Sequence, residues 1–117
     1  MIVFAVDDLM FTSKITTAAK QLGVSVVVER TAEAVLDRIH ALRPRLVVFD
    51  LNSARVRPLE TVASIKADPE LAAVRTVGFV SHVQADLIAA ARAAGMDEVL
   101  ARSAFVAKLP QILKGQG

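Results

Sequence analysis

An apolar run that ends in a carboxylate, from Leu46 to Asp50, constrains this chain more than any other stretch. Four apolar residues in a row are typical of a strand buried on both faces, as in parallel sheets covered by helices. An unpaired carboxylate is costly to bury, so we expect Asp50 at the solvent-facing mouth of the sheet. Open α/β sheets bind their ligands at this carboxyl edge. The run therefore predicts both a fold class and the place of a site.

Segments with strand and helix patterns alternate along the rest of the chain. The expected strands cover residues 2–6, 24–28, 46–50, 76–80 and 98–101. The expected helices end at Leu22, before Pro44, at Asp68, at Ala94 and at Leu113, and the last of them begins at Ala104. Such alternation predicts a parallel sheet with right-handed crossovers and helices on both faces. We expect a single domain over residues 1–117.

Composition narrows the class of protein. Hydrophobic residues make up 54% of the chain, which argues against disorder. The formal net charge of +2 is small and the basic residues are spread along the chain, so we expect no direct contact with nucleic acid. The absence of cysteine excludes disulfides and thiolate metal sites. No apolar run approaches the length of a membrane span, about 18 residues, so we expect a cytoplasmic protein that does not enter the membrane.

Polar residues follow four of the expected strands. Asp7 and Asp8 come after the first strand, Asp50 ends the third, Ser81 follows the fourth and Arg102 follows the fifth. The carboxyl ends of parallel strands open on one edge, so three carboxylates, a hydroxyl and a fixed cation converge there. Neighbouring carboxylates repel one another, which raises their pKa values unless a cation joins them. Mg²⁺ binds through a few oxygen ligands of the protein, keeps several waters and bridges to phosphate. A carboxylate beside such a metal can attack phosphorus and form an aspartyl phosphate.

This ordered set resembles the receiver domain of two-component response regulators, over essentially the whole chain. The resemblance is carried by the acidic pair in the segment 6–8, by the segment 46–52, by Ser81, by the segment 94–98 and by the turn 68–71. It implies a single flavodoxin-like (βα)5 three-layer sandwich whose five-stranded parallel sheet has the order 2-1-3-4-5.

The resemblance also implies a role for each site residue. Asp50 matches the phosphoryl acceptor, and Ser81 and Arg102 match the groups that hold the phosphoryl oxygens. The Mg²⁺ ligands would be Asp7, Asp8, Asp50 and the backbone carbonyl of Asn52.

The function implied is signalling rather than enzymatic turnover. The phosphoryl donor would be a sensor histidine kinase or a phosphotransfer protein. No effector domain follows residue 117, so we expect output through a downstream protein that binds the face formed by residues 83–114.

Two departures from the family pattern support an alternative. Receivers carry Lys-Pro at the end of the fifth strand, where this chain has Arg102 and Ser103, and their aromatic switch position is Val99 here. The guanidinium group of Arg is wide and planar, whereas the ammonium group of Lys is a compact charge. Val lacks the aromatic ring whose change of rotamer acts as the switch in the family. The alternative is a pseudo-receiver, a protein-docking module that works without phosphorylation.

Each site residue also has an ordinary structural interpretation. Asp8 can cap the first helix, Asp7 and Ser81 can be solvated or turn residues, and Arg102 can be a surface cation. Arg55 and Arg57 are expected to flank the mouth of the pocket, where they could attract an anionic donor, although a solvated loop is the favoured interpretation. Only the joint placement favours a site.

A third class, an aspartate-nucleophile phosphatase, requires Asp two residues after the nucleophile. This chain has Asn52 at that position, which disfavours the phosphatase hypothesis.

Overall fold

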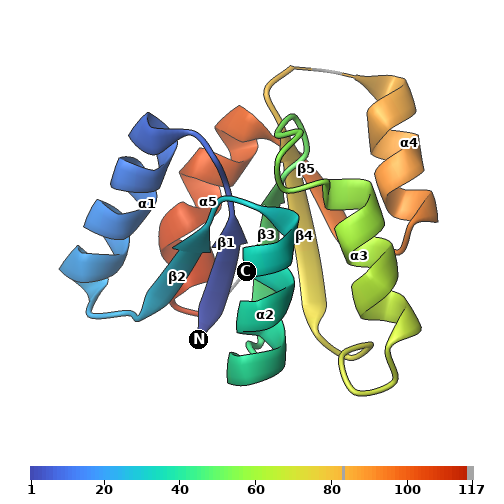
Figure 1. Cartoon of the computed structure of the whole chain (residues 1–117). Helices are drawn as coiled ribbons and strands as arrows, with labels where there is room; N and C mark the ends of the chain where they lie inside the picture. The colour runs from blue at the N-terminus through green and yellow to red at the C-terminus, as the bar shows by residue number, and fades with distance from the viewer. Residues whose placement is uncertain (83, 116–117) are drawn as a thin grey trace.

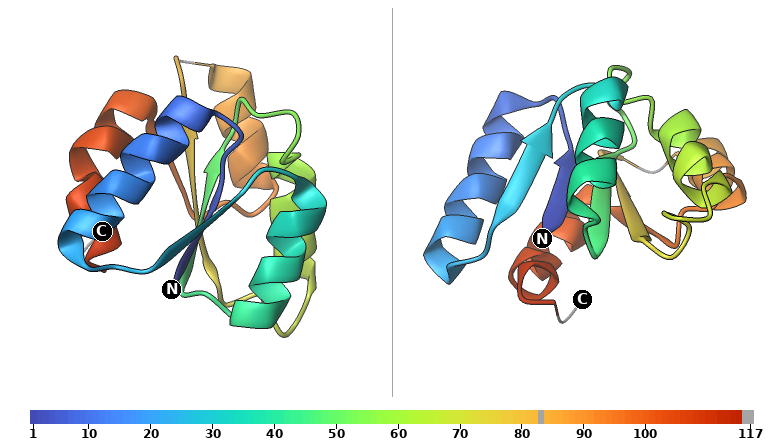
Figure 2. Two further views of the ribbon diagram at one scale, coloured as in Figure 1. Left: turned by 60° about the vertical axis from the view of Figure 1, so that its left-hand side comes forward. Right: turned by 60° about the horizontal axis from the view of Figure 1, so that its bottom comes forward.

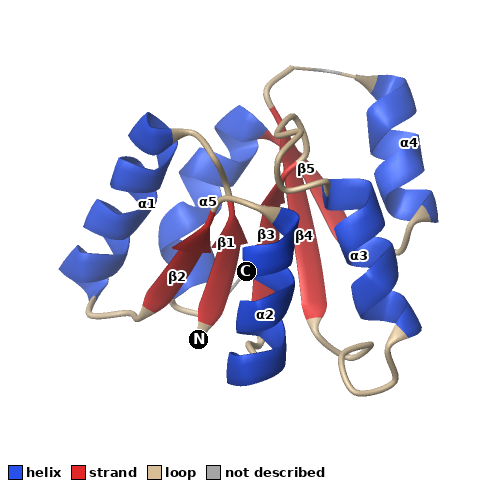
Figure 3. Cartoon of the chain, in the orientation of Figure 1, coloured by secondary structure: helices blue, strands red, loops and turns tan. Residues whose placement is uncertain are grey.

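The computed structural model describes residues 1–82 and 84–115 and shows the expected alternation of strands and helices (Figure 1). The elements, in chain order, are β1 (Ile2–Ala5), α1 (Leu9–Leu22), β2 (Val26–Glu29), α2 (Ala32–Leu42), β3 (Leu46–Asp50), α3 (Pro58–Ala67), β4 (Arg75–Val80), α4 (Ala85–Ala93), β5 (Glu98–Ala101) and α5 (Arg102–Leu113). All neighbouring strands are parallel and their order is β2-β1-β3-β4-β5, which confirms the predicted flavodoxin-like topology (Figure 3). Residue 83 of the predicted partner face and residues 116–117 of the predicted domain lie outside the described residues.

Helices cover both faces of the sheet and make two separate cores (Figure 2). One core lies between the sheet and the helices α1 and α5, and the other lies between the sheet and α2, α3 and α4. The four apolar residues of β3, from Leu46 to Phe49, are buried, as their sequence predicts. None of the described helices has the length and apolarity needed to span a membrane.

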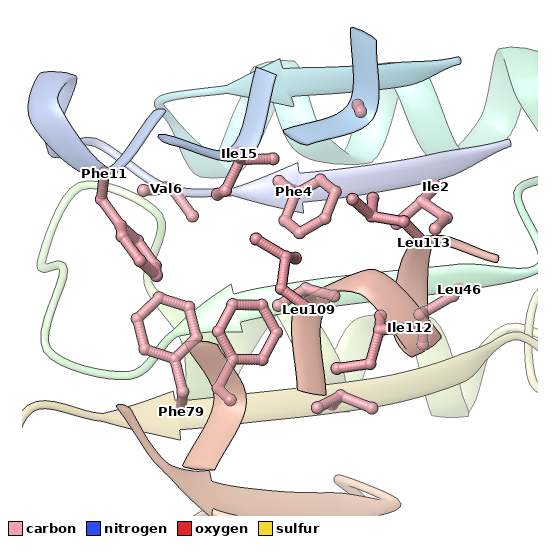
Figure 4. Close-up of a cluster of buried hydrophobic side chains, with 14 residues drawn as sticks. Ile2, Phe4, Val6, Phe11, Ile15, Leu46, Phe79, Leu109, Ile112 and Leu113 are labelled. Carbon is pink, nitrogen blue, oxygen red and sulfur yellow. The ribbon is translucent and has the colours of Figure 1, made fainter. Parts of the chain in front are cut away.

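Aromatic side chains fill the part of the first core that lies next to the carboxyl edge of the sheet (Figure 4). The Phe11 ring centroid is 4.9 Å from that of Phe79 and 6.0 Å from that of Phe105, and the last two rings stack at 4.7 Å. All three side chains are almost fully buried, and burial of each contributes roughly 1.5–3 kcal/mol to folding. The packing fixes the start of α1 against β4 and α5.

Several element ends differ from those expected, and the largest difference concerns β2. We expected this strand at 24–28, but it runs from Val26 to Glu29. Gly23 adopts φ 69°, and the N–H groups of Gly23 and Val24 donate to carbonyls of the last turn of α1. Residue 24 therefore closes the helix instead of starting the strand.

The other differences each concern one end of an element. The strand β1 ends at Ala5 rather than at residue 6, β4 begins one residue earlier than expected, and α4 ends at Ala93. The helix α5 begins at Arg102 rather than at Ala104, directly after β5. Arg102 thus belongs to the first turn of a helix, which fixes the direction of its side chain.

Candidate functional site at the carboxyl edge of the sheet

Asp50 is the last residue of the central strand β3, and its side chain is buried rather than open to solvent. Its place at the carboxyl end of the strand is as predicted, but the residue is only 9% exposed, so the expected exposure to solvent was wrong. Its Oδ1 accepts a hydrogen bond of 2.9 Å from the backbone N–H of Asn52. Burial raises the pKa of Asp50 and is the main cause of the shift; the Asn52 N–H and the Arg102 charge oppose it, and the Asp8 charge adds to it.

Asp8 caps α1. Its Oδ1 accepts hydrogen bonds from the backbone N–H groups of Met10 (2.9 Å) and Phe11 (3.1 Å). Its other oxygen, Oδ2, is 3.7 Å from Nη2 of Arg102. The ordinary structural interpretation of Asp8 is therefore correct, and the same carboxylate also faces the predicted site.

Arg102 lies over the aromatic part of the first core rather than in solvent. Its guanidinium carbon is 4.3 Å from the centroid of the Phe11 ring, and its side chain is 36% exposed. Such a cation–π contact contributes about 0.5–2 kcal/mol. Arg102 is thus held between the ring of Phe11 and the carboxylate of Asp8, close enough to Asp50 for its charge to act on that carboxyl group.

Asp7 has arginines as its partners. Its Oδ1 accepts from Nε of Arg30 at 2.9 Å and from Nη1 of Arg55 at 3.3 Å. The hydrogen bond from Arg30 is the main reason that the pKa of Asp7 is lowered. Neither arginine was predicted to contact Asp7. Arg55 was expected only near the mouth of the pocket or in a solvated loop, and Arg30, which follows β2, was not considered. Arg57, from the same loop as Arg55, pairs with Glu33 instead.

Asn52 links the loop after β3 to the segment after β4. Its side-chain Oδ1 accepts from the backbone N–H of Ser81 at 2.9 Å, and its Nδ2 donates to Oε1 of Gln84 at 2.6 Å. The sequence pointed only to the backbone carbonyl of Asn52. Its amide side chain thus has a bridging role that position alone did not indicate.

The predicted residues meet at one edge, but they do not form one cluster of carboxylates. Asp8, Asp50 and Arg102 act on one another electrostatically, Ser81 joins through Asn52, and Asp7 is held by Arg30 and Arg55. Within residues 1–82 and 84–115, no group of three or more acidic or histidine side chains is placed to hold a metal ion. The predicted roles of these residues stay predictions.

Comparison with known proteins identifies the fold. No protein-family model matches the sequence, and no curated protein matches it either. Solved structures do match. The phosphorylated cyanobacterial phytochrome response regulator RcpA is 25% identical, with a TM-score of 0.81 over 97% of this chain and 88% of that one.

Two further matches are less similar in sequence. The Mn²⁺-bound form of response regulator Rcp1 is 20% identical, with a TM-score of 0.78 over 97% of this chain and 88% of that one. A response regulator from Hahella chejuensis is 13% identical, with a TM-score of 0.86 over 98% and 92%. With its strand order and its two helical layers, this chain has the fold of response-regulator receiver domains.

Proposed function

We propose that this chain is a receiver domain that accepts a phosphoryl group on Asp50. The observation that carries the proposal is the position of this residue: a buried carboxylate at the carboxyl end of the central strand of a receiver fold, beside Asp8 and Arg102. Of its two oxygens, only Oδ1 accepts a hydrogen bond from the described residues, which leaves Oδ2 for attack on phosphorus.

The transfer is a substitution at phosphorus. An Asp50 oxygen forms a bond to phosphorus while the bond from phosphorus to the donor atom breaks, and the electron pair of that bond leaves with the donor. The three remaining phosphoryl oxygens carry negative charge that needs stabilisation. Arg102 supplies a fixed positive charge for them, and the hydroxyl of Ser81 is the second group proposed to hold them.

We propose that a divalent cation, Mg²⁺, binds beside these residues. Magnesium takes one or two carboxylates and keeps several of its waters, so Asp8, Asp50 and the carbonyl of Asn52 are a sufficient protein set. Asp7 would join only if it left its arginines. The Mn²⁺-bound state of the similar regulator Rcp1 supports a divalent cation. The cation would neutralise charge between the carboxylates and the phosphoryl group.

The proposed partners follow from the family of the fold. A sensor histidine kinase or a phosphotransfer protein would donate the phosphoryl group in the cytoplasm. A downstream protein would bind the face that extends from α4 through β5 to α5. The phosphorylated state of the similar regulator RcpA supports chemistry of this kind.

The test is phosphorylation by acetyl phosphate with and without Mg²⁺, read by intact mass. The wild type should gain one phosphoryl group, and Asp50→Asn should gain none because the nucleophile is removed. Asp37→Asn, which removes an exposed carboxylate from α2, is the matched control and should label like the wild type.

Two results would contradict the proposal. Labelling of Asp50→Asn at the wild-type level would mean that another residue accepts the group. If the wild type stays unlabelled with Mg²⁺ present, the pseudo-receiver alternative gains support, in which a partner binds the wild type and Asp50→Asn equally well.

A further inference from the structure

Asp7 is the one residue of the predicted metal site whose carboxylate is engaged by two guanidinium groups. Arg30 and Arg55 both donate to its Oδ1, at 2.9 and 3.3 Å, and its side chain is 25% exposed. The same carboxylate would have to turn toward a cation bound between Asp8 and Asp50. The two guanidinium groups engage the carboxylate oxygen that would bind the cation, and their positive charges also repel the cation.

The backbone fixes the positions of both arginines. Arg30 directly follows β2, whose last residue Glu29 lies in register with Ala5 of β1, so Arg30 reaches the same edge as Asp7. The carbonyl of Arg55 accepts a hydrogen bond of 3.0 Å from the N–H of Ala32, which ties the loop after β3 to the start of α2. The main chain therefore brings both arginines to the edge of the sheet at which Asp7 lies.

We propose that Arg30 and Arg55 form a latch on Asp7 that sets the affinity of the site for a divalent cation. In the latched state a cation is held by Asp8, Asp50 and the Asn52 carbonyl alone. Asp7 becomes available only when both ion pairs open, so binding of the cation and opening of the latch are linked. This inference rests on the proposed function, because it concerns the same site.

The latch makes the affinity for the cation lower than it would be if Asp7 had no arginine partners. Exposed ion pairs are modest, so removal of either arginine should tighten Mn²⁺ binding by about two- to fivefold. Removal of both should tighten it further. The gain should shrink at high salt, because screening weakens exposed ion pairs in the wild type.

The experiment is a Mn²⁺ titration followed by paramagnetic broadening of amide NMR signals near Asp8, Asp50 and Asn52. The proteins are the wild type, Arg30→Ala, Arg55→Ala and the double variant. Arg38→Ala is the matched control, because Arg38 is a half-exposed arginine on the neighbouring α2 that pairs with Glu29 at 2.6 Å and not with Asp7. It removes the same charge without touching the latch.

A second background isolates the pairwise contact from the general loss of positive charge. In Asp7→Asn, Arg55→Ala should no longer change the Mn²⁺ affinity, because the latched carboxylate is gone. The latch is overturned if Arg30→Ala and Arg55→Ala bind Mn²⁺ like the wild type, or if Arg38→Ala tightens binding as much as they do.

The outcome for the latch is separable from that for the proposed function. If Asp50 of the wild type is labelled and the arginine variants bind Mn²⁺ like the wild type, the latch proposal is contradicted and the proposal that Asp50 accepts the phosphoryl group stands. Mn²⁺ binding seen only after the arginines are removed would support the latch directly. If neither the wild type nor any variant binds Mn²⁺, the latch proposal is contradicted. If Asp50 is also not labelled, the proposed function is contradicted as well.

Discussion

At the scale of single residues, Asp50 combines a charge with burial, and this makes its protonation part of the folding equilibrium. Burial raises the pKa of Asp50 in the folded chain above its ordinary value. The folded state therefore binds this proton more tightly than the unfolded state does. The destabilisation due to the buried charge is absent below the ordinary pKa of an Asp, about 4, and is complete above the raised pKa.

We expect Asp50→Asn to be more stable than the wild type at neutral pH, because the amide fills the same space without a charge. Its oxygen can still accept from the N–H of Asn52. The difference in the free energy of unfolding between the two proteins should shrink as the pH falls through the raised pKa. Urea unfolding at neutral and at acid pH measures this difference.

The exposed Asp37→Asn serves as the control, since it should show no comparable gain at neutral pH. A variant Asp50→Asn that is less stable than the wild type at neutral pH would show that the carboxylate makes contacts worth more than its burial costs.

At the scale of elements, the start of α1 shows one side chain with two possible roles. Asp8 satisfies two N–H groups of the first turn and faces Arg102, and it is one of the ligands proposed for the cation. Replacement of an N-cap by Ala costs about 0.5–2 kcal/mol, whereas Asn caps a helix about as well as Asp. The two substitutions therefore separate the roles of Asp8.

We expect Asp8→Ala to lower the free energy of unfolding by about 0.5–2 kcal/mol. Asp8→Asn should retain most of the stability, since its oxygen keeps the cap and only the charge is lost. Both variants should bind Mn²⁺ more weakly than the wild type. Thermal unfolding and the same Mn²⁺ titration test the two roles. Wild-type Mn²⁺ affinity in Asp8→Asn would mean that Asp8 only caps the helix.

The order of elements could be predicted from the sequence because it depends on local patterns. Apolar runs such as 46–49 mark buried strands, and the Gly and Pro residues between them mark helix ends. The start of β2 could not be predicted in this way. The N–H of Val24 closes α1 by a hydrogen bond to Ala19, and a β-branched residue gives no sign of that use.

The site was predictable to the same extent. The placement of Asp50, Asp8 and Arg102 at one edge follows from strand ends in a parallel sheet, which the sequence shows. The pairing of Asp7 with Arg30 and Arg55 depends on how three loops meet, and the low exposure of Asp50 depends on tertiary packing around the end of β3. Residue spacing contains neither kind of information.

At the scale of the whole molecule, the site borders the core between the sheet and α1 and α5. Arg102 rests on Phe11, whose ring contacts Phe79 of β4 and Phe105 of α5. Val99 packs against the other core, on the opposite face of the sheet. Movement of Arg102 toward a phosphoryl group would uncover the Phe11 ring and change the first core before the second.

We therefore expect beryllium fluoride, a mimic of the phosphoryl group, to shift the ring proton signals of Phe11, Phe79 and Phe105 more than the methyl signals of Val99. In Arg102→Lys the ring shifts should be smaller, because an ammonium group lacks the planar face that stacks on Phe11. A conventional switch through β5 predicts the reverse order, with Val99 and α4 responding first. Larger shifts at Val99 than at the three rings would contradict a route through Arg102 and Phe11. Shifts confined to the rings would show how a chain of this fold with Val at position 99 can still respond at α1 and α5.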